Sequence, residues 1–248
     1  MSEPKKQRRR IYLMRHGAVT YFMPDGTPIP PHDVPLNSDG IAQATAAGQL
    51  FLSHSVTFDR VIVSGLPRTV ETAALVLETG GHSHTVEHWP QLQEIKSGRL
   101  AEIPFDTLRQ SFANMHAGAA DMDAKFLGGE TWRELMTRVI PEIDSIRDDG
   151  NWHTLLMVLH GGVNRALLSY LLTGMPQLIG GFEQSPAAIN IIDVGDTKGD
   201  VVLRASNLSP TDWLQSDTRA STMEILFGQY AKYRLQQNAT QDSKQNSA

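Results

Sequence analysis

Two short apolar segments of this chain each run directly into a histidine and a glycine. They are Ile11-Tyr12-Leu13-Met14-Arg15-His16-Gly17 and Leu155-Leu156-Met157-Val158-Leu159-His160-Gly161-Gly162. Apolar runs of this length are typical of buried strands, and ligands of open α/β sheets bind at the carboxyl ends of the strands. The two strand ends could therefore bring His16 and His160 into one crevice. Arg15, next to His16, suggests an anionic ligand such as a phosphate.

Composition favours one globular domain. The chain has 248 residues, of which 40% are hydrophobic and 20% charged, an ordinary balance for a soluble domain. The net charge of −5 argues against general nucleic-acid binding, and the lack of cysteine excludes disulfides and thiolate catalysis. No apolar run reaches the roughly 18 residues of a membrane helix, and Arg15 and His16 interrupt any signal-peptide core after the basic start. We expect a cytoplasmic protein with no membrane or nucleic-acid partner, and a homodimer stays open.

Composition also sets the expected boundaries. Residues 1–9 form a basic, flexible tail, residues 10–234 a single catalytic domain, and residues 235–248 a polar tail rich in Gln, Asn and Ser. A segment with so few apolar residues is expected to stay disordered.

Strand and helix patterns alternate along the domain. Strands are predicted at 10–15, 60–64, 85–89, 154–159, 188–194 and 201–205, and helices at 38–52, 67–77, 130–146 and 163–172. This alternation predicts an α/β fold, a three-layer α/β/α sandwich with a largely parallel central sheet. Residues 95–128 show no clean periodicity and predict an irregular, partly helical excursion.

Single residues predict how these helices begin, face and end. Asn37 or Ser38 caps the first helix, Pro67 lies in the first turn of the second, and Gly174 closes the last. Pro141 should end or kink the helix that contains it. Two core faces are expected, formed by Ile41, Ala44, Gly48 and Phe51 in one helix and by Leu135, Val139, Ile143 and Ile146 in another.

Two arginines at strand ends suit a phosphate. The planar guanidinium group meets phosphate oxygens bidentately and stays charged. Arg15 ends the first strand, and Arg68 follows the second in Ser64-Gly65-Leu66-Pro67-Arg68-Thr69, inside a helical turn with unpaired N–H groups. Together with His16 and His160, these arginines would form a pocket for a dianion.

Phosphoryl transfer from such a pocket needs a nucleophile and a proton donor. A neutral histidine can attack phosphorus when a backbone carbonyl holds its other nitrogen. A carboxylic acid beside a dianion can stay protonated near neutral pH because of charge repulsion. Glu94, just after the third predicted strand, is the best-placed acid; Glu87, Glu102 and Glu130 are its competitors.

Six sequence blocks in one order resemble the histidine phosphatase superfamily, in the branch that includes the cofactor-dependent phosphoglycerate mutases. They are Leu13-Met14-Arg15-His16-Gly17, Leu36-Asn37-Ser38-Asp39-Gly40, Val63-Ser64-Gly65-Leu66-Pro67-Arg68-Thr69, Leu92-Gln93-Glu94, Gly128-Gly129-Glu130-Thr131 and Leu159-His160-Gly161-Gly162. The resemblance covers about residues 11–205. It implies phosphorylation of His16, with Glu94 as proton donor and then as the base that activates water.

The same resemblance implies a phosphate pocket of Arg15, Arg68, His160 and Gly161, with no cofactor and no metal. It also shows departures. Family members often carry Ser or Thr where Val19 stands, and the mutases carry Asn where Phe22 stands. We expect the hydroxyl of Thr20 to take part in phosphate binding instead.

These departures favour hydrolysis. The mutases' paired arginines after the acid are missing, and only Lys96 and Arg99 lie nearby. We expect a phosphomonoester hydrolase acting on a small phosphorylated metabolite through a phosphohistidine. The alternatives are a phosphoglycerate mutase and a non-catalytic, phosphate-binding regulatory protein.

Other segments leave the substrate open. The lid over the pocket should come from residues 21–35 and 95–128, where Phe22, Pro24, Phe105, Phe112 and Met115 suggest an apolar wall. Sugars, nucleotides and phosphopeptides all remain candidates. A second histidine cluster, His82, His84 and His88, suggests zinc by its spacing, but a solvated loop entering an edge strand explains it better.

Overall fold

Six strands form one sheet in a computed structural model, which describes residues 8–25, 27–113, 121–215 and 219–245. The strands are β1 (Arg9–Arg15), β2 (Arg60–Val63), β3 (Val86–His88), β4 (Thr154–Leu159), β5 (Ile189–Val194) and β6 (Val201–Leu208). Their order across the sheet is β3-β2-β4-β1-β5-β6. β3, β2, β4 and β1 are parallel, whereas β5 and β6 run antiparallel to their neighbours. The predicted, largely parallel sheet is confirmed.

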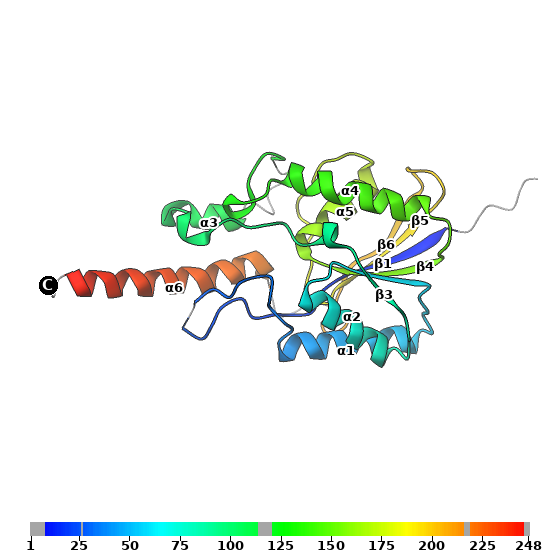
Figure 1. The fold of residues 1–248 in the computed structure, drawn as a ribbon, viewed down its shortest axis with the longest axis horizontal. Helices are drawn as coiled ribbons and strands as arrows, with labels where there is room; N and C mark the ends of the chain where they lie inside the picture. Colours follow the sequence, from blue (N-terminus) through cyan, green and yellow to red (C-terminus); the bar gives the residue numbers. More distant parts are fainter. Residues whose placement is uncertain (1–7, 26, 114–120, 216–218, 246–248) are drawn as a thin grey trace, which may run out of the picture.

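Two pairs of helices cover the sheet, one on each face. α1 (Ser38–Ser53) and α2 (Pro67–Thr79) pack against one another on the lower face in Figure 1, and α4 (Trp132–Asp148) and α5 (Gly161–Thr173) on the upper face. The three-layer sandwich is therefore confirmed.

The middle strand β1 explains why both faces are covered. Ile11 and Leu13 belong to the core shared with α4 and α5, and Tyr12 and Met14 belong to the core shared with α1 and α2. Successive side chains of a strand point to opposite faces. A continuous apolar run is consequently buried on both sides.

Helix ends follow the sequence signals closely. The Asn37 side chain accepts a hydrogen bond from the Gly40 N–H at 2.9 Å, Pro67 opens α2, and Gly174 ends α5 in the left-handed region with φ of 71°. The buried face of α1 differs from the expectation at Ile41, which is 48% exposed. Gly40 lies on the buried side instead, because its backbone packs so close to the Ala18 carbonyl that a Cβ would lie 2.1 Å from that oxygen.

The prediction that Pro141 ends or kinks its helix is wrong as to the end, since α4 continues to Asp148. Proline removes one N–H, and its cost is greatest where the freed carbonyl is shut off from water. Pro141 is exposed, so that face of α4 is solvated. Leu135, Val139, Ile143 and Ile146 form the buried face of α4, as expected.

A separate layer lies beyond the carboxyl end of β1. It contains α3 (Phe105–Ala113), α6 (Thr222–Gln245) and the short 3-10 turns η2 (Leu100–Glu102) and η4 (Phe126–Gly128). A further 3-10 turn, η1 (Pro90–Leu92), packs against α4, and its Leu92 belongs to the core shared with α4 and α5. α3 packs on α6, and both project to the left of the sheet in Figure 1. A third apolar cluster holds this layer together, formed by Leu108, Phe112, Leu127 and Tyr230, with Phe22 stacked on Tyr230 at 6.1 Å between ring centroids.

This cluster corrects part of the expected apolar wall. Phe22 and Phe112 belong to it, but Phe105 and Pro24 are exposed, and Met115 lies outside the described residues. α6 extends to Gln245, through a stretch that composition marks as disordered from residue 235. The division of the chain into two tails and one domain stays a prediction.

In the part of the chain that the structure describes, no helix combines the length and the hydropathy needed to cross a bilayer. No three side chains of metal-ligand type gather there in an arrangement that could hold an ion, although the rings of His82 and His84 lie 6.1 Å apart.

Candidate active site

The two His-Gly strand ends meet at one point of the sheet. β1 and β4 are parallel neighbours, with Arg15 beside Leu159 in the register, and the His16 N–H donates to the Leu159 carbonyl at 2.9 Å. The ring centroids of His16 and His160 lie 5.3 Å apart. Both side chains are buried. The structure therefore brings the two imidazoles together, as the two strand ends predict.

One hydrogen bond fixes the tautomer of His16. Its Nδ1 lies 2.7 Å from the carbonyl oxygen of Gly17. A carbonyl can only accept, so Nδ1 carries the proton and Nε2 keeps its lone pair. Gly17 is itself fixed, because its N–H donates to Thr72 Oγ1 at 3.0 Å and a Cβ on it would lie 2.6 Å from the Gly40 carbonyl oxygen.

His16 is also held in its neutral form. Burial lowers its pKa well below the ordinary value, and the positive charges of Arg15 and Arg68 lower it further. A neutral imidazole with a fixed free lone pair is the form that attacks phosphorus.

His160 is held by a chain of three hydrogen bonds that runs through the hydroxyl groups of Ser64 and Thr69. Thr69 Oγ1 donates to the Leu66 carbonyl at 2.8 Å, so Ser64 Oγ must donate to Thr69 Oγ1, at 3.1 Å. Ser64 Oγ then accepts from His160 Nε2, at 2.8 Å. The chain assigns the Nε2 proton to neutral His160 and leaves its Nδ1 as an acceptor. Burial, followed by the charge of Arg68, lowers the pKa of His160 well below its usual value.

Arg15 and Arg68 lie close enough to both histidines for their charges to lower the pKa of each ring. Arg15 Nη1 donates to the Gln184 carbonyl and to Thr222 Oγ1 at 3.1 Å. Arg68 Nη1 donates to the Pro31 carbonyl at 2.7 Å, which ties the 21–35 loop to α2. The Nε atoms of both arginines and Nδ1 of His160 are buried and have no hydrogen-bond partner in the described part of the chain.

The two arginine nitrogens indicate the ligand. A buried polar atom without a partner costs about 1–3 kcal/mol and calls for an explanation. Both arginine Nε–H groups are donors on fixed cations. Two such donors fit an oxyanion with several acceptor oxygens, as a phosphate has.

Glu94 lies against the first turn of α5, which begins directly after His160. Its Oε1 accepts from the Gly162 N–H at 3.1 Å and from the Ile95 N–H at 3.0 Å, and its Oε2 lies 3.2 Å from the same Gly162 nitrogen. The competing acids are paired with arginines: Glu87 with Arg60, Glu102 with Arg99 and Glu130 with Arg138. This geometry favours Glu94 as the acid.

Gly161 and Thr20, the other two residues predicted to bind phosphate, lie in different surroundings. Gly161 is the first residue of α5, and a Cβ on it would lie 3.5 Å from Arg15 Nε, which places its backbone beside the pocket. Thr20 is exposed, and its hydroxyl lies 3.4 Å from the Asn37 side-chain nitrogen. Phosphate binding by Thr20 stays a prediction that no contact supports.

Two further residues of the site escaped sequence reasoning. Ser64, quoted only as part of a motif, fixes the tautomer of His160. Tyr21 lies within electrostatic range of the site: burial raises the pKa of its phenol, while the charges of Arg68 and Arg15 lower it and that of Glu94 raises it. Tyr21 belongs to none of the motifs in the sequence, so no sequence signal pointed to it.

Comparison with known proteins identifies the family of this chain. A family model described as "Histidine phosphatase superfamily (branch 1)" matches residues 11–207, well over half of the chain. A 6-phosphofructo-2-kinase/fructose-2,6-bisphosphatase of Gallus gallus is 29% identical over 167 residues, which are 66% of this chain and 33% of that protein. The chain therefore corresponds to about a third of that relative.

Two other relatives are matched over more of their length. A probable phosphoglycerate mutase, GpmB, of Salmonella paratyphi A is 29% identical over 169 residues, 67% of this chain and 76% of that protein. Among solved structures, a protein of Escherichia coli K-12 assigned as an alpha-ribazole-5'-P phosphatase has a TM-score of 0.59 at 25% identity. The alignment covers 81% of this chain and 96% of that one.

Proposed function

This chain belongs to branch 1 of the histidine phosphatase superfamily, and from that premise we propose that it is a phosphomonoester hydrolase that works through a phosphohistidine at His16. One observation carries the proposal. The Nδ1 proton of His16 is committed to the Gly17 carbonyl, which leaves Nε2 as a neutral nucleophile beside two buried arginines.

In the first step, His16 Nε2 attacks phosphorus as the bond to the leaving oxygen breaks. The new bond is N–P, and the electron pair of the old P–O bond goes to the leaving alkoxide. Glu94 gives its proton to that oxygen, and an alcohol departs. Arg15, Arg68 and His160 stabilise the charge on the three equatorial oxygens, the usual source of catalysis in phosphoryl transfer.

In the second step, water attacks the phosphohistidine. The Glu94 carboxylate accepts a proton from that water, the N–P bond breaks, and its electron pair returns to Nε2. Inorganic phosphate leaves, and Glu94 is again protonated for the next cycle. We assign the charge stabilisation to the arginines and therefore propose a metal-independent reaction without a cofactor.

Hydrolysis is favoured over mutase activity, although one relative is named as a probable phosphoglycerate mutase. A mutase must also bind a second acidic group of its substrate. Of the two cations that follow Glu94, the Arg99 side chain is 85% exposed and pairs with Glu102, and Lys96 is exposed. A non-catalytic regulatory role is disfavoured because the nucleophile, the acid and both arginines are all present.

The proposed substrate is a small phosphorylated metabolite. A relative assigned as an alpha-ribazole-5'-P phosphatase supports this size class, and the apolar cluster around Phe22 and Tyr230 would line the approach. We further propose that the protein acts in the cytoplasm without a membrane or nucleic-acid partner, in keeping with its net charge of −5. The homodimer stays a prediction.

Steady-state assays test the reaction class. With 4-nitrophenyl phosphate, the wild type should hydrolyse the ester, whereas His16→Ala should lose turnover because it lacks the proposed nucleophile. His153→Ala, a histidine on the surface, is the control and should keep wild-type turnover. Full activity in His16→Ala would overturn the proposal.

A second assay separates hydrolase from mutase. 3-Phosphoglycerate is supplied with and without the bisphosphate primer, and both 2-phosphoglycerate and inorganic phosphate are measured. Release of phosphate without isomerisation supports the hydrolase, and primer-dependent isomerisation that exceeds phosphate release would contradict it.

A further inference from the structure

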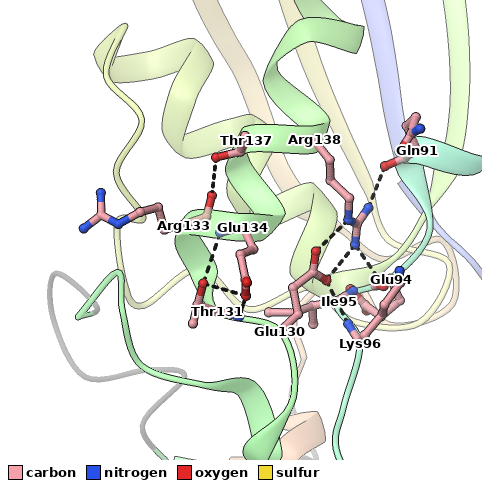
Figure 2. Close-up of polar contacts among 10 residues, drawn as sticks. All are labelled: Gln91, Glu94, Ile95, Lys96, Glu130, Thr131, Arg133, Glu134, Thr137 and Arg138. Atoms are coloured by element: carbon pink, nitrogen blue, oxygen red, sulfur yellow. Dashed lines mark hydrogen bonds and ion pairs between the residues drawn. The ribbon is translucent and has the colours of Figure 1, made fainter.

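Arg138 of α4 reaches from its helix to the segment that carries Glu94. Its Nη1 donates to the Gln91 carbonyl at 2.5 Å and its Nη2 to the Glu94 carbonyl at 3.1 Å. Figure 2 shows the side chain lying across this segment rather than along its own helix. The backbone carbonyls of Gln91 and of Glu94 itself are thus bound to one guanidinium group.

Glu130 completes the contact from the other side. Its carboxylate binds Arg138 bidentately, at 2.8 Å to Nε and 3.0 Å to Nη2. Glu130 Oε2, the oxygen that binds Arg138 Nη2, also accepts from the Lys96 N–H at 3.0 Å. The Glu130 N–H donates to the Lys96 carbonyl at 2.8 Å. The pair therefore holds the chain at residues 91, 94 and 96, on both sides of the Glu94 side chain (Figure 2).

Glu130 is not needed to begin α4. The capping box of that helix consists of Thr131 and Glu134, whose side chains bind one another's backbone N–H groups at 3.1 and 2.8 Å. Glu130 points away from this cap toward Arg138 (Figure 2). A carboxylate at the start of a helix usually stabilises that helix end. In α4 Glu134 does this, so the position of Glu130 needs another explanation.

The pair is also mostly enclosed. The side chains of Arg138 and Glu130 are 17% and 9% exposed. Burial alone would raise the pKa of Glu130, but the hydrogen bonds from Arg138 and the Lys96 backbone outweigh it, and the pKa lies below its usual value. An enclosed ion pair adds little net stability once desolvation is counted, and its best-attested role is to specify one geometry.

We propose that Glu130 and Arg138 are positioning residues for Glu94, which set the distance between its carboxyl group and the leaving oxygen of the substrate. The inference rests on the proposed role of Glu94 as proton donor. Residues 93–99 form no helix or strand, so backbone contacts at 91, 94 and 96 set where this segment lies, while the Gly162 and Ile95 N–H groups bind the carboxyl group itself. A displacement of 1 Å in a reacting group can cost about 100-fold in rate.

The test compares two substrates that differ in their need for an acid. The oxygen of glycerol 2-phosphate leaves as an alkoxide and needs a proton, whereas the phenolate of 2,4-dinitrophenyl phosphate leaves without one. kcat/KM reports the first chemical step for both. For Arg138→Lys, which keeps the charge but loses the planar fork, kcat/KM for glycerol 2-phosphate should fall by about 10- to 100-fold. kcat/KM of Arg138→Lys for the dinitrophenyl ester should stay at the wild-type value. We expect Glu130→Gln to show the same selective loss on glycerol 2-phosphate.

Arg133→Lys is the matched control. Arg133 also lies on α4 and also binds a carboxylate bidentately, that of Asp123, at 2.7 and 3.0 Å. Its side chain points to solvent, away from the Glu94 segment (Figure 2). Both substrates should react as in the wild type. A purely structural role of Arg138 would lower the two rates of Arg138→Lys equally, which would overturn the inference.

Glu94→Gln separates failure of the inference from failure of the proposed function. If Glu94 is the acid, Glu94→Gln loses activity selectively on glycerol 2-phosphate, and adding Arg138→Lys to it costs little more. If Glu94→Gln is selective but Arg138→Lys is not, the positioning role is wrong and the acid stands. If Glu94→Gln shows no selectivity, the proposed acid itself is wrong, and the inference falls with it.

Discussion

At the scale of single residues, proton positions decide what each histidine can do. The Gly17 carbonyl gives His16 a free Nε2, and the chain through Ser64 and Thr69 gives His160 a free Nδ1. Neutral His160 thus presents a lone pair to the pocket, and a phosphate oxygen also carries only lone pairs. His160 can donate to a phosphate only after it gains a proton.

Phosphate binding should therefore take up a proton at His160. Inorganic phosphate is titrated into the wild type and into His160→Asn by calorimetry, in mildly alkaline buffers that differ in ionisation enthalpy. The amide of the variant donates without protonation, so its proton uptake should be smaller. Equal uptake by the two proteins would show that His160 does not gain the proton.

Sequence reasoning reached five residues of this site because each stands beside a recognisable strand or helix end. Arg15, His16, Arg68, Glu94 and His160 all have that signature. Ser64 also stands at a strand end, but its role and that of Arg138 depend on which group of a distant segment lies within hydrogen-bond reach. Thr20, chosen from a departure in a motif, lies at the surface instead.

At the scale of elements, the first turn of α5 contacts both the proposed phosphate site and the proposed acid. Its N-cap is His160, and its second residue, Gly162, donates to Glu94. A Cβ at Gly162 would lie 2.6 Å from Glu94 Oε1 and 3.1 Å from Ile95 Cγ2. An alanine Cβ at this position would therefore clash with the end of the Glu94 side chain, which can move, and not with backbone atoms.

Gly162→Ala should accordingly separate stability from activity. Alanine favours a helix over glycine by about 1 kcal/mol, so Tm should not fall, while the displaced Glu94 should lower kcat/KM for glycerol 2-phosphate by about 10-fold or more. Gly161→Ala is the comparison, since its Cβ would make only an ordinary contact with Arg15 at 3.5 Å, and it should lose less. Wild-type kcat/KM in Gly162→Ala would contradict the close approach.

Element boundaries also show what sequence patterns can and cannot settle. Asn37, Pro67 and Gly174 act locally, so their effects on helix ends were predictable. Pro141 and Ile41 were misjudged because the outcome depends on which face of a helix meets the sheet. That face is set by tertiary packing, as when Gly40 is drawn against the Ala18 carbonyl.

At the scale of the whole molecule, the alternation of strands and helices was enough to predict the sandwich. It did not predict the layer that contains α3 and α6. α3 and α6 are joined by apolar contacts between segments far apart in the sequence, which no local periodicity reports. The sheet buries two neutral histidines at its carboxyl edge. That burial links the stability of the fold to pH.

The free energy of unfolding should fall as the pH drops below about 6.5, the ordinary histidine pKa. Burial lowers the pKa of both His16 and His160 in the folded state. Below the ordinary value the unfolded chain binds more protons than the folded one, so stability is present above that pH and is lost beneath it. Urea unfolding of the wild type and of His160→Asn, without phosphate, should show a shallower loss in the variant. Identical pH dependence in the two proteins would show that burial of His160 does not contribute to the loss of stability.

The most direct test of the account locates the phosphoryl group itself. Glu94→Gln, which lacks the base for the second step, is mixed with 2,4-dinitrophenyl phosphate, quenched in alkali and digested for mass spectrometry, with phosphorus NMR to assign the nitrogen. The account predicts one acid-labile phosphohistidine, at His16 and on Nε2. Phosphate on another residue, or on Nδ1 of His16, would contradict it.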